Sequence, residues 1–122
     1  MDLKTQRNLD RFMELLGIHG VVTDEYLELS KENERLFFEQ KENHVLFSVA
    51  SPIESNLIQQ AQMWVMPRLN LERTHGLPVR CFCLRELLVC SVSIPQEKFS
   101  GDTLYPLYQY LHRLLKQSIR NN

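Results

Sequence analysis

The sequence predicts an α+β fold in the order α-β-β-β-α-β-β-α, with an antiparallel sheet flanked by helices. Residues 26–50 and 77–94 alternate apolar and polar side chains between short polar turns, which is typical of antiparallel hairpins. Apolar residues at helical spacing occur before, between and after these two stretches. Because 122 residues are enough for one core but not for two, we expect residues 1–122 to form a single domain.

The composition argues against several classes of protein. The 14 basic and 15 acidic residues give a net charge of -1, without the basic surface that binds nucleic acid. No apolar run approaches the roughly 20 residues that span a bilayer, and the first residues lack the apolar core of a signal peptide. Three cysteines, an odd number, favour a reducing cytoplasm over a disulfide framework. We therefore expect neither a nucleic-acid partner nor insertion into a membrane.

The first helix is predicted over residues 2–17. It ends at Gly17, which suits the left-handed position just after a helix. Its apolar stripe consists of four residues: Leu9, Phe12, Met13 and Leu16.

Three strands are predicted next, at residues 26–30, 35–40 and 44–50. Turns of even length keep one apolar set on one side of this meander: Leu27, Leu29, Leu36, Phe38, Val45, Phe47 and Val49. The opposite side is polar, with three apolar exceptions: Tyr26, Phe37 and Leu46. These three are either scattered surface residues, which are common, or a docking strip for an extended peptide.

The central helix is expected within Ser51–Leu71. Ser51 suits the N-cap, Pro52 the first helical position, and Glu54 completes a capping box. Pro67 lies inside the helical pattern and removes a backbone hydrogen bond, so the helix should end or kink there. Its apolar stripe comprises Leu57, Ile58, Ala61, Trp64 and Val65, and Ile53, Met63 and Met66 lie off that stripe. A helix with apolar residues on several faces needs neighbours on two sides.

A second hairpin is predicted from residues 77–84 and 87–94, with Arg85 and Glu86 at the turn. This turn pairs Leu84 with Leu87, Phe82 with Val89, and Cys81 with Cys90. Both faces are apolar enough to be buried, so one side should face a helix and the other a second subunit. The last helix should be capped by Ser100 or Asp102, and its stripe is the cleanest in the chain: Leu104, Leu107, Tyr108, Leu111, Leu114, Leu115 and Ile119.

No residue pattern predicts an enzyme, a metal site or a cofactor. Cys81, Cys83 and Cys90 could share a metal with a histidine, but cysteine also packs as a small buried hydrophobe, which is the simpler interpretation. No phosphate-binding loop and no hydrolase signature occurs. Carboxylates at Glu32 and Glu34 fall in a turn-like segment and are expected to be solvated.

The arrangement as a whole resembles the class I type III secretion chaperones, the family of the Tir chaperone. The stretch that sharpens the likeness is G-L-P-V-R-C-F-C-L-R-E-L-L-V-C-S-V-S-I, residues 76–94, followed by the amphipathic helix Leu104–Ile119. It looks most like the small subunit of the heterodimeric chaperone of the secretion gatekeeper. One departure is the nearly neutral charge with a basic last helix, since these chaperones are usually acidic.

The resemblance implies a cytosolic bacterial protein used in virulence. Such a protein holds an extended segment of a secreted effector or gatekeeper, keeps it secretion-competent, and contacts the export apparatus at the inner membrane without inserting. It also implies a homodimer, or a heterodimer with a second chaperone of the same fold. The implied dimer interface comprises Leu57, Ile58, Ala61, Trp64, Val65, Phe82, Leu84, Leu87 and Val89. The implied client-binding residues are Phe12, Leu16, Tyr26, Phe37 and Leu46. For Phe12 and Leu16, core packing is the alternative.

Two further hypotheses are a dimeric α/β adaptor for folded partners and a small thiol or metal enzyme.

Overall fold

A computed structural model describes residues 2–21 and 24–120 of the chain. The elements follow the predicted order. They are α1 (Leu3–Leu16), β1 (Tyr26–Lys31), β2 (Glu34–Gln40), β3 (His44–Pro52), α2 (Ile58–Val65), β4 (Val79–Leu84), β5 (Leu87–Pro95) and α3 (Gly101–Arg120), with short 3-10 turns η1 (Met66–Arg68) and η2 (Gln96–Lys98). Within the described ranges, no helix is long and apolar enough to cross a membrane.

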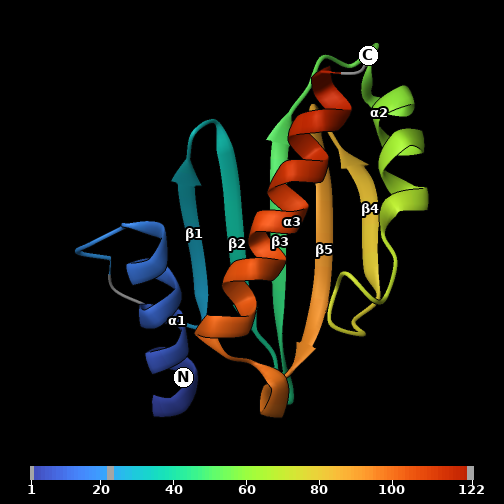
Figure 1. Cartoon of the computed structure of the whole chain (residues 1–122). Coiled ribbons are helices and arrows are strands. Elements are labelled where there is room, and N and C mark those ends of the chain that lie inside the picture. The colour runs from blue at the N-terminus through green and yellow to red at the C-terminus, as the bar shows by residue number, and fades with distance from the viewer. Residues whose placement is uncertain (1, 22–23, 121–122) are drawn as a thin grey trace.

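The five strands form one antiparallel sheet in the order β1-β2-β3-β5-β4. Pairing of β3 with β5 joins the first three strands to the second hairpin, as Figure 1 shows. Both tight hairpins have two-residue turns, which pair Lys31 with Glu34 and Leu84 with Leu87. The predicted even turns and the predicted pairing of Phe82 with Val89 and Cys81 with Cys90 are therefore confirmed.

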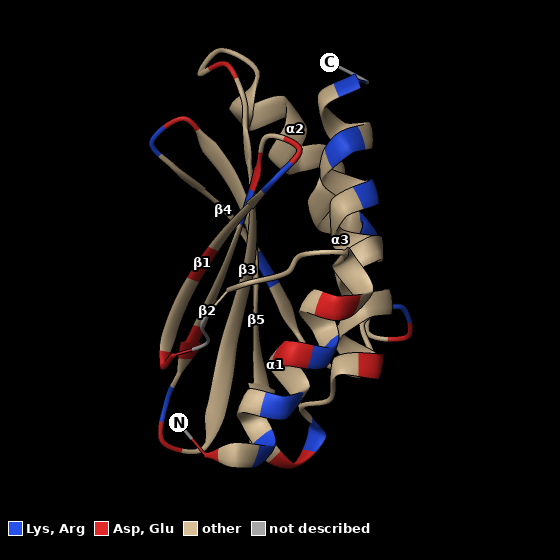
Figure 2. Cartoon of the chain, turned by 90° about the vertical axis from the view of Figure 1, so that its left-hand side faces the viewer, with Lys and Arg blue, Asp and Glu red and all other residues tan. Residues whose placement is uncertain are grey.

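One face of the sheet is packed against α1 and α3, which lie together on one side of it in Figure 2. The residues predicted to share a face in the first three strands are all buried there: Leu27, Leu29, Leu36, Phe38, Val45, Phe47 and Val49. At the centre of this core the Phe12 ring meets those of Phe38, Phe47 and Tyr108 edge to face, at centroid distances of 5.6, 5.9 and 5.8 Å. Such edge-to-face arrangements are favourable for aromatic rings.

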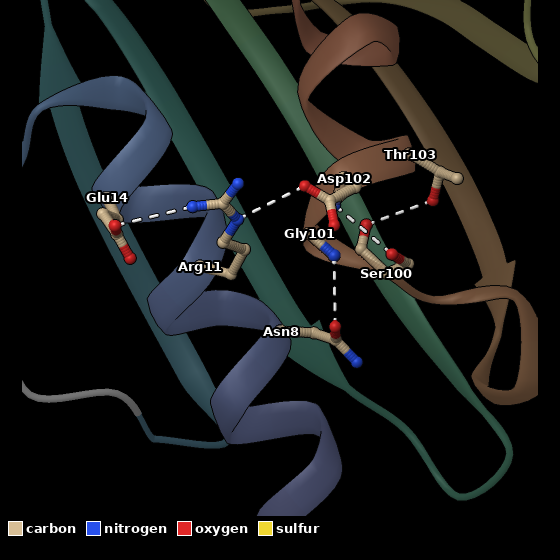
Figure 3. Close-up of polar contacts among 7 residues, drawn as sticks. All are labelled: Asn8, Arg11, Glu14, Ser100, Gly101, Asp102 and Thr103. Atoms are coloured by element: carbon tan, nitrogen blue, oxygen red, sulfur yellow. Dashed lines mark hydrogen bonds and ion pairs between the residues drawn. The ribbon is translucent and has the colours of Figure 1, made fainter.

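The junction of α1 and α3 is tight because the first residue of α3 is a glycine. A Cβ atom on Gly101 would come within 2.7 Å of the Asn8 carbonyl oxygen and 2.8 Å of the Arg11 side chain. Polar contacts fasten the same junction: the Gly101 N–H donates to Asn8 at 3.2 Å, and Arg11 pairs with Asp102 at 3.3 Å (Figure 3). The close approach sets where α3 begins on the sheet.

The helix ends agree with the predicted signals except at α2. Gly17 ends α1 in the left-handed conformation, at φ 77°, and the Ser100 hydroxyl accepts from the Asp102 N–H at the start of α3. The prediction that Ser51, Pro52 and Glu54 open the central helix is wrong, since Ser51 and Pro52 are the last residues of β3. They pair with β5, and this pairing over the buried face outweighs the local helix-start signal.

The segment around Pro67 resolves the predicted choice between an end and a kink. The α-helix stops at Val65 and passes into the 3-10 turn η1, in which Pro67 is a first-turn residue. Proline is well placed there because the first N–H groups of a helical turn have no partner within it.

Candidate functional site

The second face of the sheet carries no helix within the described ranges. Alternate residues of the same strands point to this open face, and its side chains form cross-strand rows. One row places Glu39 between Tyr26 and Leu46, and the neighbouring row places Phe37 between Glu28 and Ser48. We use the name open face for this surface of β1, β2 and β3.

The three predicted docking residues thus gather around one carboxylate. Tyr26 is 56% exposed, Phe37 and Leu46 are partly exposed, and Glu39 pairs with Lys41 at 2.7 Å. Slight burial, together with the charges of Glu28 and Glu39, raises the pKa of Tyr26, so its hydroxyl stays neutral. The result is three apolar side chains that surround the Glu39 carboxylate on an otherwise polar surface.

Phe12 and Leu16 occupy a different place from these three residues. Both are buried in the core beneath the packed face, so core packing describes their position. They present no surface to a ligand in this conformation.

The two edges of the sheet differ in what covers them. In the β1–β2 ladder, Leu27, Leu29 and Lys31 hydrogen-bond with β2, so the backbone groups of the alternate residues Tyr26, Glu28 and Ser30 point outward. Among the described residues, none of these outward groups has a backbone hydrogen-bond partner. A row of unpaired N–H and C=O groups is a ready template for another strand.

The β4 edge, in contrast, is partly covered by α2. The Gln62 side-chain amide donates to the Cys81 carbonyl at 3.0 Å, and the Cys83 thiol donates to Gln62 at 3.2 Å. Gln62 therefore occupies an edge group that a new strand would need. The sequence offered no signal for this contact, because glutamine fits an exposed helix position equally well.

The residues predicted for a dimer interface lie around β4 but on both sides of it. Phe82 and Leu84 are 39% and 55% exposed and point to the open-face side, whereas α2 packs beside Cys81 and Cys83 on the other side. Leu57, Ile58, Trp64 and Leu87 are partly exposed, while Ala61, Val65 and Val89 are buried within the chain itself. The exposed apolar surface of α2 also includes Met63 and Met66.

A buried polar cluster joins α3 to the sheet, and the sequence analysis missed it. Glu34 is only 5% exposed, which corrects its predicted solvation. Its carboxylate accepts from the hydroxyls of Ser51 at 3.2 Å and Tyr108 at 3.4 Å, and contacts Nδ1 of His112 at 2.6 Å. Burial, with the Glu34 charge beside it, raises the pKa of Tyr108, so this hydroxyl remains a donor. The spacing of Tyr108 and His112, one helical turn apart on α3, was the available signal.

The cysteines form a pair and a separate thiol. Cys81 and Cys90 face each other in the register, and a hydrogen bond from Cys90 lowers the pKa of Cys81. Cys83 is exposed and contacts Gln62. Over residues 2–21 and 24–120, no group of three or more metal-binding side chains comes together.

A family model covers almost the whole chain, from residue 2 to residue 118. The chain belongs to the SsaM family. No curated protein matches it.

Among solved structures, this member of the SsaM family is similar to a chain of the HopA1–SchA chaperone–effector complex. The TM-score is 0.67 at 20% identity, and the match covers 98% of each chain. A weaker likeness is to YbjN, described as a putative transcription regulator from E. coli, with a TM-score of 0.49, 14% identity, and coverage of 93% and 84%. The first likeness confirms the predicted fold class, the α+β architecture of the type III secretion chaperones.

Proposed function

We propose that this chain is a type III secretion chaperone. In this proposal it binds an extended segment of a secreted effector or gatekeeper protein, keeps that client soluble and secretion-competent, and targets it to the export apparatus. The likeness in fold to a chain of a chaperone–effector complex supports the class. The proposal further takes residues 1–122 as one domain that works in the bacterial cytoplasm and contacts the apparatus at the inner membrane.

The observation that carries the proposal is the open edge of β1 beside the open face. An extended segment gains backbone hydrogen bonds when it adds to an exposed edge, and its alternate side chains reach apolar sites on the adjoining face. Tyr26 is on the edge strand itself, whereas Phe37 on β2 and Leu46 on β3 lie farther across the open face. The outward-pointing groups of β1 and the partly covered β4 edge favour strand addition at β1.

The proposed mechanism is non-enzymatic and uses no cofactor. Ordering an extended client costs conformational entropy, which the wrapped surface must offset. Such a complex holds the segment apart from the rest of its own chain until the export machinery takes it.

The proposal also includes a partner of the same fold, either a second copy or a related small-subunit-type chaperone. The exposed apolar surface on both sides of β4 is the surface for it, formed by Trp64, Phe82, Leu84 and the residues around them. We include a gatekeeper among the proposed clients because residues 76–94 resemble the small subunit of the gatekeeper chaperone.

The test uses N-terminal segments of secreted proteins from the same bacterium, mixed with the purified chain. Hydrogen exchange should show new protection at the amides of Tyr26, Glu28 and Ser30 when a client binds. Phe37→Asp should weaken client binding by about ten-fold or more, because a charge would replace an aromatic contact residue. Leu3→Asp is the matched control, since Leu3 is an exposed apolar residue on α1, away from the open face.

Two results would overturn the proposal. If the chain bound only folded domains and no unfolded segment, it would be an adaptor. If protection appeared along β4 and not along β1, or if Leu3→Asp and Phe37→Asp weakened binding equally, the proposed client surface would be incorrect.

A further inference from the structure

The half of α3 that leads to the C-terminus carries three positively charged side chains. Arg113, Lys116 and Arg120 are exposed, and none of them forms an ion pair within the described residues. The blue bands on this part of α3 in Figure 2 mark these cations. Attraction to the helix dipole falls off within the last turn, so it does not account for Arg113, about two turns from the end.

The segment that follows α2 brings two more cations to the same place. Arg68 and Arg73 line one wall of a hollow of ≈ 390 Å³, whose other wall on α3 includes Tyr110 and Arg113. A second hollow of ≈ 260 Å³ shares Arg113 and continues along α3 past Lys116 and Arg120. No Asp or Glu lines either hollow. We call these two hollows together the basic groove.

The wall formed by η1 is held in position. The Arg68 guanidinium lies 3.8 Å from the centroid of the Trp64 ring and donates to the Trp64 carbonyl at 2.6 Å. The Tyr110 hydroxyl donates in turn to the Arg68 carbonyl, which fastens η1 to α3. Because Arg68 is already held in position, it loses less conformational freedom when a ligand binds than a free side chain would.

We propose that the basic groove binds an acidic segment of a partner protein. Four of its five cations are arginines, whose planar guanidinium groups pair with carboxylates through two parallel hydrogen bonds. The site is distinct from the open face, because the exposed side of α3 points away from the sheet that its other side covers. The inference does not rest on the chaperone function.

The shape and charge of the surroundings favour a peptide over other acidic partners. A membrane is a broad anionic surface that is best met by protruding cations, whereas Arg68, Arg73 and Arg113 line a recess between two elements, and Lys116 and Arg120 extend it along α3. Nucleic-acid binding needs neutralisation of many successive phosphates, and the chain as a whole has a net charge of -1. Lys116 and His112 also line a hollow with Glu32 and Glu34, so acidic side chains border the groove on that side.

The test measures the fluorescence anisotropy of a labelled glutamate-rich peptide with the full chain. The double variant Arg113→Glu/Lys116→Glu should weaken binding by about ten-fold or more, and Arg113→Gln/Lys116→Gln should weaken it less. The control Lys4→Glu/Arg7→Glu makes the same change in net charge at exposed positions of α1 and should keep wild-type binding within about two-fold. Circular dichroism establishes that all variants are folded.

The outcomes distinguish a peptide site from a net-charge effect, from the open face and from a membrane-binding surface. Selective loss in the groove variants supports the site, and their unchanged client binding would separate it from the open face. Equal loss in the groove and control variants would reduce the effect to net charge and overturn the proposal. Binding of anionic phosphatidylglycerol vesicles in place of the peptide would also overturn it, in favour of a membrane.

Discussion

The two faces of the sheet are built from the same strands but have different properties. On the packed face, Phe38 is 1% exposed and lies among the aromatic rings beneath α1 and α3. Its neighbour in β2, Phe37, points to the open face and remains partly exposed. Because successive side chains of a strand alternate between faces, adjacent positions of one strand are packed in the core and exposed on the open face. Under the proposed function, stability and client binding should therefore respond to substitutions at different positions of the same strand.

The largest expected effect is the loss of a ring from the packed face. Phe38→Ala should lower the free energy of unfolding by about 3–5 kcal/mol, because it removes buried area and leaves a cavity against Phe12 and Phe47. Phe37→Ala should lower it by less than about 1 kcal/mol. Urea unfolding followed by circular dichroism measures both. A similar loss in the two variants would mean that the open face is covered in the free protein.

The buried carboxylate of Glu34 and the exposed carboxylate of Glu39 should also differ in their contribution to stability. Glu34→Ala should cost about 2–3 kcal/mol, because it leaves the buried hydroxyls of Ser51 and Tyr108 without their acceptor. Glu39→Ala on the open face should cost about 0–1 kcal/mol, since it removes a solvent-exposed pair with Lys41. The same unfolding experiment compares them. Equal values would show that the Glu34 cluster does not help to hold α3 on the sheet.

The distinction between the faces could be predicted from the sequence because the period of a strand is exactly two residues. Once the turns have even length, the whole set from Leu27 to Val49 falls on one side, and the structure confirms this. The caps at Gly17 and Ser100 were equally predictable, since they depend on local backbone chemistry.

The remaining features depend on contacts between distant residues. The cap signal at Ser51 was overridden by pairing of β3 with β5, and the burial of Glu34 depends on residues 74 and 78 positions away. The pattern of α2 also did not reveal that Ala61 and Val65 would be covered by the chain itself. The residues next to a position in the sequence do not reveal which distant residues cover its side chain in the fold.

The smallest effects on folding are expected on α2, where the adjacent residues Val65 and Trp64 differ in burial. Val65 is buried, so Val65→Ala should destabilise the chain by about 1–3 kcal/mol. Trp64 is partly exposed, with Arg68 over its ring, and also packs against the edge of the core, so Trp64→Asp should cost about 1–2 kcal/mol. The main effect of Trp64→Asp should be on association.

Light scattering measures this association. Two chains of 14.5 kDa give a dimer near 29 kDa, and this mass is expected for the wild type and the Leu3→Asp control. Because a charge in an apolar contact opposes association, Trp64→Asp should sediment and scatter as a monomer. A dimer that survives this change would place the subunit contact elsewhere, and a stable wild-type monomer would leave the apolar surface around β4 to a partner of another kind.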